Sequence, residues 1–69
     1  MIVEWVLPED LTAARTAREH VAEDLGRRGV PDDVVDDLVL IASELAANAV
    51  RHGSPPAVLE LHYDHDRIR

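Results

Sequence analysis

The stretch that decides the fold runs from Ala42 to Gly53 and reads ASELAANAVRHG. It closes a long run of helical periodicity that opens at Pro31, where a proline followed by two aspartates suits the first turn of a helix. Arginine and histidine fit the last turn, and Gly53 fits the stop. The pattern therefore predicts a helix from Pro31 to His52. The apolar face of this helix comprises Val34, Leu38, Ile41, Ala42, Leu45 and Ala49.

Three polar side chains follow one side of the same helix. At about 100° per residue, Asn48 lies about 80° and Glu44 about 120° from Leu38, the middle of the apolar face. Asp37 joins them at about 100° on the same count. Such positions at the border of the core can face a cleft, where a carboxylate and an amide oxygen suit magnesium-assisted phosphoryl transfer. On spacing alone, an ordinary solvated helix face is the commoner explanation of this row.

The residues before the long helix predict a strand and a first helix. Met1–Leu7 is short and rich in β-branched residues, and Pro8 ends it, which is typical of a strand. A helix is then predicted from Pro8-Glu9-Asp10 to the Gly26–Gly29 stop, where glycines and arginines form a C-terminal signal. The apolar face of this first helix comprises Leu11, Ala14, Val21 and Leu25, with Arg18 filling the gap.

The residues after the long helix predict a hairpin. Residues 54–56 read as a turn, Ala57–Tyr63 as a strand, 64–66 as a second turn and 67–69 as the start of a third strand. One face of the strand would carry Leu59, Leu61 and Tyr63, and the other Val58, Glu60 and His62. The predicted order β-α-α-β-(β) is an α+β fold, with two helices packed on an incomplete antiparallel or mixed sheet. We expect a single partial domain over residues 1–69.

The composition limits what the chain can be. Its 69 residues carry 14 acidic and 7 basic groups, which gives a formal charge of −7. Phosphate neutralisation needs clustered basic residues, so this balance argues against a nucleic-acid partner. No cysteine is present, no apolar run approaches the roughly 20 residues of a membrane helix, and the N-terminus lacks a basic signal-peptide start. We therefore expect a small cytoplasmic domain without a membrane partner, too short for an enzyme with a deep two-lobed cleft.

A longer motif is much more specific than the polar row. The string SELAANAVRHG over Ser43–Gly53 follows an acidic amphipathic lead-in and precedes the strand-like PPAVLEL. It resembles the N-box of the histidine-kinase-type ATPases, which include gyrase-like topoisomerases, histidine kinases and heat-shock chaperones. The greatest similarity is to the anti-sigma-factor serine kinases and their small relatives, and it covers nearly all 69 residues.

The resemblance implies two cofactors and a set of site residues. The family binds ATP with Mg²⁺, and its N-box asparagine, here Asn48, ligates the Mg²⁺ that bridges the ATP phosphates. The N-box glutamate, here Glu44, is the catalytic residue that orients or deprotonates the attacking nucleophile. Arg51 and His52 match the basic end of the box, which lies near the nucleotide phosphates. The implied partners are a sigma factor or an anti-sigma-factor antagonist protein.

The family's adenine-binding motif is missing from these residues. An aspartate followed by a Gly-x-Gly turn should come just after the third strand, and a glycine-rich lid and a last glycine box should follow. We therefore expect the N-terminal half of an ATP-binding regulatory domain, with negligible ATP affinity and no kinase activity of its own. The alternative is a non-catalytic interaction or dimerisation module that keeps the helices of the fold but not ATP binding.

Other polar clusters have simpler explanations. The run His62–Asp66, with two histidines and two aspartates, could bind a divalent metal, although such strand ends and turns are more often merely solvated. We expect His20 at the surface and Trp5 in the core. The four aspartates within residues 32–37 mark a solvated helix start, or a patch for an arginine-rich partner.

The short core also predicts self-association. A chain of this length without a disulfide or metal has few means of stabilising a core, and an unfinished sheet leaves ladder groups unpaired. Salt screens the net charge beyond about 8–10 Å, whereas burial at a contact is unaffected. We therefore expect a homodimer or larger homo-oligomer, joined through residues 57–63 and 67–69 or by exchange of an element between copies.

Overall fold

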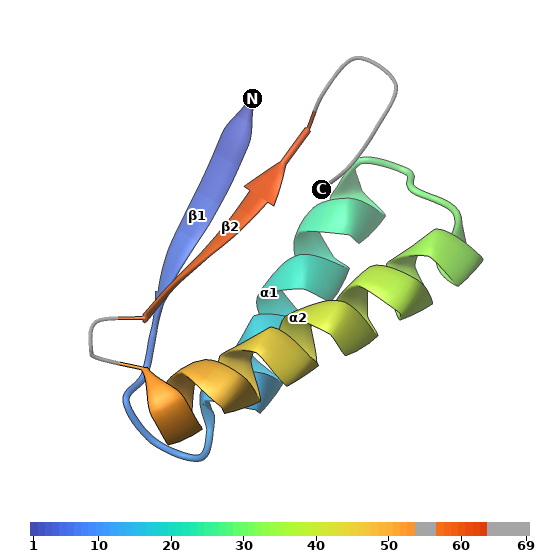
Figure 1. The fold of residues 1–69 in the computed structure, drawn as a ribbon. Coiled ribbons are helices and arrows are strands. Elements are labelled where there is room, and N and C mark those ends of the chain that lie inside the picture. The colour runs from blue at the N-terminus through green and yellow to red at the C-terminus, as the bar shows by residue number, and fades with distance from the viewer. Residues whose placement is uncertain (54–56, 64–69) are drawn as a thin grey trace.

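A computed structural model describes residues 1–53 and 57–63, which form two strands and two helices (Figure 1). Along the chain the elements are β1 (Ile2–Leu7), α1 (Ala13–Arg27), α2 (Asp32–His52) and β2 (Ala57–His62). This β-α-α-β order confirms the predicted α+β class. The predicted turns at 54–56 and 64–66 and the third strand at 67–69 lie outside the described residues. None of the described helices has the length and apolar character needed to cross a membrane.

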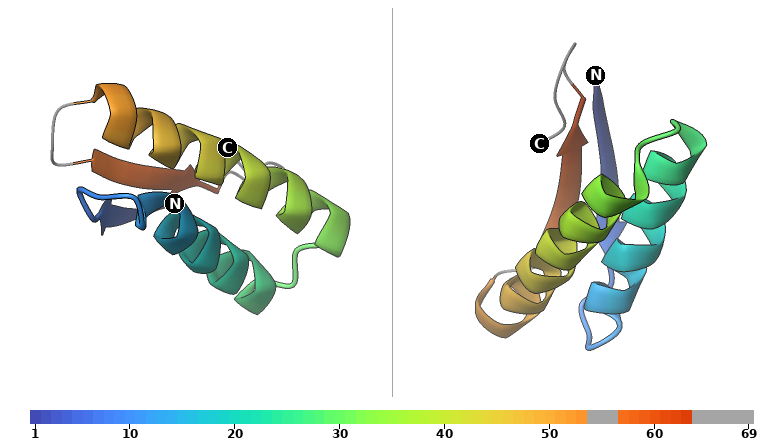
Figure 2. Two further views of the ribbon diagram at one scale, coloured as in Figure 1. Left: turned by 90° about the horizontal axis from the view of Figure 1, so that it is seen from below. Right: turned by 90° about the vertical axis from the view of Figure 1, so that its right-hand side faces the viewer.

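β1 and β2 pair as an antiparallel sheet, and both helices lie on one of its faces (Figure 2). The register places Trp5 opposite Leu59 and Glu4 opposite Glu60. Alternation along β2 turns Leu59 and Leu61 toward the helices, where both are buried, and leaves Glu60 exposed. The two faces of β2 are therefore those predicted from its sequence.

α1 begins later than the sequence predicts. The Asp10 carboxylate accepts hydrogen bonds from the backbone N–H of Thr12, at 2.8 Å, and from the Thr12 hydroxyl. This turn occupies the residues predicted to form the first helical turn, so the prediction of a helix from Pro8 is wrong at this end. Leu11, predicted on the apolar face, is 92% exposed. The buried apolar face of α1 instead comprises Ala13, Ala17, Val21 and Leu25.

The end of α1 is confirmed at the predicted glycines. Gly29 has a positive φ of 73°, and its N–H donates to the carbonyl of Gly26 at 3.1 Å. The N–H of Val30 donates to the carbonyl of Leu25, also at 3.1 Å, which completes a Schellman motif. Because residues with a Cβ rarely adopt this φ, Gly29 fixes the point at which the chain leaves α1 and turns toward α2.

α2 is rotated relative to its predicted orientation. Its buried residues are Ala42 and Ala46, because α2 packs mainly along α1 and small side chains let the two helices approach closely. Val34, Ile41 and Leu45 were predicted in the core, but Ile41 is 52% and Leu45 57% exposed. This prediction is wrong, since the apolar arc of α2 is wider than the part that α1 and the sheet cover. We call Val34, Ile41 and Leu45 the apolar strip.

Trp5 and His20 stack across the contact between β1 and α1. Their ring centroids lie 5.3 Å apart, and the ring planes are 9° from parallel. Trp5 packs against the core, as predicted. The prediction of His20 as a plain surface residue is wrong, because the indole covers its imidazole and leaves it half-buried. The stack therefore helps to hold β1 against the middle of α1.

A buried carboxylate ties the end of the sheet to α1. Asp24, 4% exposed, accepts hydrogen bonds from the Tyr63 hydroxyl, from Arg28 Nε at 2.9 Å and from Arg27 Nη2 at 3.0 Å. The Arg28 guanidinium also lies 4.1 Å from the centre of the Tyr63 ring. Burial alone would raise the pKa of Asp24, but the hydrogen bonds from Tyr63 and Arg28 outweigh it and hold that pKa below its usual value. Burial, with the bond to Asp24, raises the pKa of Tyr63 to about 12.

Candidate functional site

The last turns of α2 bring three of the predicted site residues into one row. Glu44, Asn48 and Arg51 follow at spacings of four and three residues, so their side chains are neighbours along the helix. Arg51 Nη2 donates a hydrogen bond to Asn48 Oδ1 at 3.2 Å. All three residues are exposed, and so is His52 in the last turn. We call Glu44, Asn48, Arg51 and His52 the polar face of α2.

The polar face points away from the core rather than along its border. Glu44 and Asn48 each lie two residues from the buried Ala46, which places both about 160° from it around the helix. Asp37 is exposed as well. The predicted border position is therefore wrong, because the rotation of α2 toward α1 turns the row to solvent. A ligand can reach these side chains directly, and the exposed surface beside them is the apolar strip.

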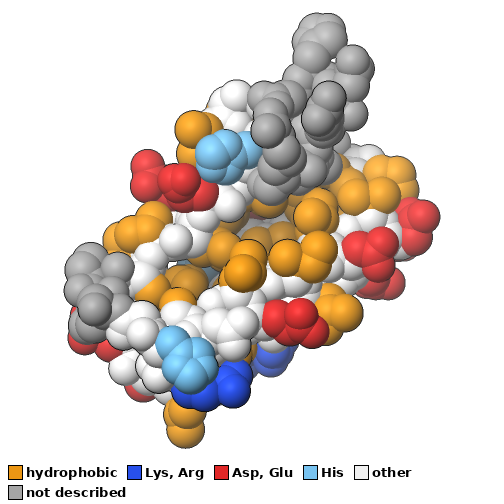
Figure 3. Space-filling model, viewed as in Figure 1, with side chains coloured by type: hydrophobic (Ala, Val, Ile, Leu, Met, Phe, Trp, Pro, Cys, Tyr) orange, Lys and Arg blue, Asp and Glu red, His pale blue; other side chains and the backbone are white. Residues whose placement is uncertain are grey.

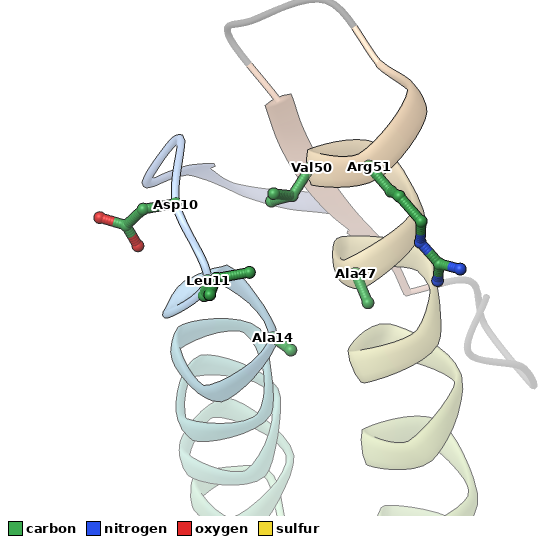
Figure 4. A pocket seen from close by; sticks show the side chains of 6 residues that line it. All are labelled: Asp10, Leu11, Ala14, Ala47, Val50 and Arg51. Carbon is green, nitrogen blue, oxygen red and sulfur yellow. The ribbon is translucent and has the colours of Figure 1, made fainter.

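A cavity opens where the start of α1 meets the end of α2 (Figure 4). Its volume is about 270 Å³, and its lining comprises Asp10, Leu11, Ala14, Ala47, Val50 and Arg51. The Arg51 side chain runs along the outer side of α2, away from the gap between the helices (Figure 4). The cavity therefore offers mainly apolar contact, and Glu44, Asn48 and His52 are not part of its lining.

Ser43, the first residue of the N-box-like string, holds α2 against α1. Arg18 Nη1 donates a hydrogen bond to Ser43 Oγ at 2.9 Å. From the sequence, Arg18 is only a polar gap in the apolar face of the first helix, but in the structure it links the two helices beside the buried Ala42. The two residues are 25 positions apart, so no local pattern connects them.

The possible metal site at the end of β2 is only partly within the described residues. His62 Nε2 lies 3.3 Å from Glu60 Oε1, while residues 64–66 fall outside that part of the chain. Over the residues that the structure describes, no group of three or more metal-ligating side chains converges. The four aspartates at the start of α2 are all exposed, in line with a solvated helix start. A metal in the run His62–Asp66 stays a prediction.

Comparison with known proteins bears on most of the chain. A family model described as a histidine kinase-like ATPase domain matches residues 7–68. This span includes α1, α2 and β2, and with them every residue of the polar face. No curated protein and no solved structure matches the chain.

Proposed function

The chain belongs to the histidine kinase-like ATPase domain family, and on this premise we propose that the polar face of α2 is the phosphate and metal side of an ATP site. The supporting observation is an amide oxygen, a guanidinium and a carboxylate on one exposed side of a single helix. Phosphoryl transfer uses these groups to hold Mg²⁺, to bind phosphate oxygens and to orient a nucleophile. The resemblance to anti-sigma-factor serine kinases extends the proposal to a transcription regulator whose partner is a sigma factor or its antagonist.

The residues present fit Mg²⁺ and the ATP phosphates. An amide oxygen has two lone pairs, so the hydrogen bond that Asn48 Oδ1 accepts from Arg51 leaves one lone pair for a hard cation. Arg51 uses one N–H donor in this bond and keeps others for phosphate oxygens. Bound Mg²⁺ would neutralise part of the phosphate charge.

Each residue of the polar face has its own proposed role. Asn48 ligates Mg²⁺, while Arg51 and His52 contact phosphate oxygens at the basic end of the helix. Glu44 lies one turn before Asn48, and its carboxylate orients the nucleophile or accepts its proton. Because Glu44 is exposed, a hydroxyl group of a substrate can reach it without displacing any part of the core.

The 69 residues offer little to hold the adenine base. Their three glycines are Gly26, Gly29 and Gly53, and none forms a Gly-x-Gly pair. We therefore expect the isolated chain to bind phosphates weakly through the polar face. Calorimetry should then detect no saturable Mg-ATP binding at millimolar nucleotide, and the chain should have no kinase activity.

NMR of the isolated chain tests this proposal. Mg-tripolyphosphate and Mg-ATP should shift the backbone amide signals of residues 44–52 alike, whereas adenosine should leave them unchanged. Arg51→Ala should remove most of this response, and the matched control Arg15→Ala, which removes an exposed arginine from α1, should keep it. Saturable Mg-ATP binding that adenosine competes for, or an equal loss of response in both variants, would contradict the proposal.

A different observation favours the alternative function, a non-catalytic interaction module. The apolar strip is exposed beside β2, and exposed apolar surface of this kind is typical of protein-binding sites rather than of phosphate sites. The alternative predicts that the chain binds a protein in the absence of nucleotide. It also predicts that Asn48→Ala leaves that binding unchanged.

A further inference from the structure

An exposed leucine lies beside the apolar cavity at the end of the molecule where the start of α1 meets the end of α2. The cavity has a volume of about 270 Å³, and Ala14, Ala47 and Val50 are among the residues that line it. Leu11 lies at its rim and is 92% exposed, the largest exposed fraction of any large hydrophobic side chain within the described residues. This end of the molecule therefore presents a protruding apolar side chain next to an apolar hollow.

A short hydrogen-bonded turn holds Leu11 at the rim. The Asp10 carboxylate accepts hydrogen bonds from the backbone N–H and the hydroxyl of Thr12, both through the same oxygen, Oδ1. The N–H of Ala13 donates to the carbonyl of Asp10 at 3.1 Å, which joins the turn to the first residue of α1. Because the backbone on both sides of Leu11 is already ordered, covering its side chain costs little further backbone entropy.

The cavity lies far from both Met1 and Tyr63. These two residues pair through two backbone hydrogen bonds of 2.8 Å, and the Tyr63 hydroxyl donates to Asp24 near the end of α1. Asp24 follows Ala14 by ten positions, which corresponds to about 15 Å along the helix axis. All six residues that line the cavity are among those that the structure describes. The opening is therefore a feature of the start of α1 and the end of α2 themselves.

Charged side chains of both signs flank the cavity. Across its opening the order is Asp10, Leu11, the cavity and then Arg51, as Figure 4 shows. Residues 9–18 and 47–52 include the whole lining and carry two acidic residues and three arginines: Glu9, Asp10, Arg15, Arg18 and Arg51. Figure 3 shows basic side chains gathered beside the end of α2, whereas acidic side chains follow the rest of that helix. The net charge of −7 is therefore not concentrated at this end, where the two signs nearly balance.

We propose that a second copy of the chain docks at this end across a two-fold axis, with Leu11 of each copy inserted into the cavity of the other. A two-fold axis through the middle of the order given above exchanges Leu11 with the cavity and Asp10 with Arg51. Asp10 of each copy then faces the partner's Arg51. Both bonds from Thr12 end on Asp10 Oδ1, so Oδ2 can accept from that guanidinium, which uses Nη2 toward Asn48 and keeps other N–H donors.

Other occupants suit this surface less well. A small molecule in the cavity would leave Leu11 exposed, whereas a second copy covers it. A partner with charges of one sign would meet either Asp10 or Arg51 with a like charge, whereas a second copy meets each with its opposite. The surface also differs from residues 57–63 and 67–69, through which the sequence predicts association. Because the contact is small, we expect a weak dimer.

Sedimentation equilibrium of the chain as it is, without nucleotide, tests the proposal. At concentrations of about 0.1–1 mM, chosen for a small interface, the unmodified chain should form dimers. Leu11→Gln removes the inserted side chain and should weaken the dimer by about tenfold or more, and Ala47→Leu, which fills the cavity from within, should do the same. The matched controls are Leu40→Gln, at a 59% exposed position of α2, and Ala22→Leu, at an exposed position of α1. Both should dimerise within about twofold of the unmodified chain.

Several outcomes would overturn the proposal. A chain that stays monomeric at about 1 mM does not use this surface for a dimer. If Leu11→Gln and Leu40→Gln weaken the dimer equally, the contact does not lie at the cavity. If Leu45→Gln abolishes the dimer while Leu11→Gln keeps it, the contact lies on the apolar strip. Circular dichroism confirms the fold of each variant, and Leu11→Gln decides the matter if Ala47→Leu fails to fold, because Leu11 is almost fully exposed.

Discussion

α1 and α2 both carry an apolar face, but only α1 has that face covered. The residues Ala13, Ala17, Val21 and Leu25 of α1 are at most 1% exposed. In α2, by contrast, Leu40, Ile41 and Leu45 are each more than half exposed. The contrast teaches that the buried contact of α1 with one side of α2 and with the sheet holds the fold together. α2 contributes one side to the core and leaves its polar face and the apolar strip exposed.

The largest expected effect separates the two helices by stability. Leu25→Ala removes a fully buried side chain of α1 and should lower the free energy of unfolding by about 2–5 kcal/mol, a large share of the stability of a small domain. Leu45→Ala, in α2, should lower it by less than about 0.5 kcal/mol, because that side chain is 57% exposed. Urea unfolding followed by circular dichroism measures both. Equal losses would mean that the apolar strip is covered in solution and that the contrast between the helices fails.

The extent of α2 could be predicted from the sequence, but its rotation could not. Periodicity and end signals predicted residues 31–52, and the observed helix is Asp32–His52. The apolar arc, however, is wider than the contact it makes, and periodicity does not say which part of the arc a neighbour covers. The close approach of α1 at Ala42 and Ala46, with the Arg18–Ser43 hydrogen bond beside it, selects one side. This tertiary choice has no local signal.

The candidate site was likewise predictable in its residues but not in its exposure to solvent. Glu44, Asn48 and Arg51 could be selected from the motif because their spacing is local to one helix, and the structure places them in one row. Their exposure to solvent depends on the rotation of α2 and was not predicted. The hydrogen bond between Tyr63 and Asp24 could not be predicted from the sequence, because 39 positions separate the two residues. An aspartate near the end of a helix is also usually exposed to solvent.

A smaller loss of stability is expected at the buried carboxylate of α1. Tyr63→Phe removes the hydroxyl that donates to Asp24 and should lower the free energy of unfolding by about 1–2 kcal/mol near neutral pH. Arg27 and Arg28 still pair with Asp24 in this variant, which limits the loss. Urea unfolding measures it. A loss close to zero would show that the sheet end does not depend on this contact, so that α1 would be less firmly fixed than the comparison requires.

The pH dependence of the same contact sharpens the test. The pKa of Tyr63 is raised from 10.0 to about 12 in the folded chain, so its stabilising effect is complete below pH 10 and is lost as the pH rises toward 12. The difference in stability between the unmodified chain and Tyr63→Phe should shrink over that interval.

The contribution of Asp24 to stability depends on pH in the opposite direction. Because its pKa is lowered from 3.8, its contribution is present above pH 3.8 and is lost as the pH falls through the folded pKa. Unfolding curves at a series of pH values measure both effects.

The central claim is that the polar face of α2 binds ligands and does not stabilise the fold. The variant Asn48→Ala tests this claim most directly when its stability and its response to ligand are measured on one sample. Asn48 is exposed on the side of α2 opposite Ala46, so the free energy of unfolding should change by less than about 0.5 kcal/mol. The amide shifts that Mg-tripolyphosphate causes over residues 44–52 should disappear. A loss of stability above about 1 kcal/mol, or an unchanged response to Mg-tripolyphosphate, would contradict the account.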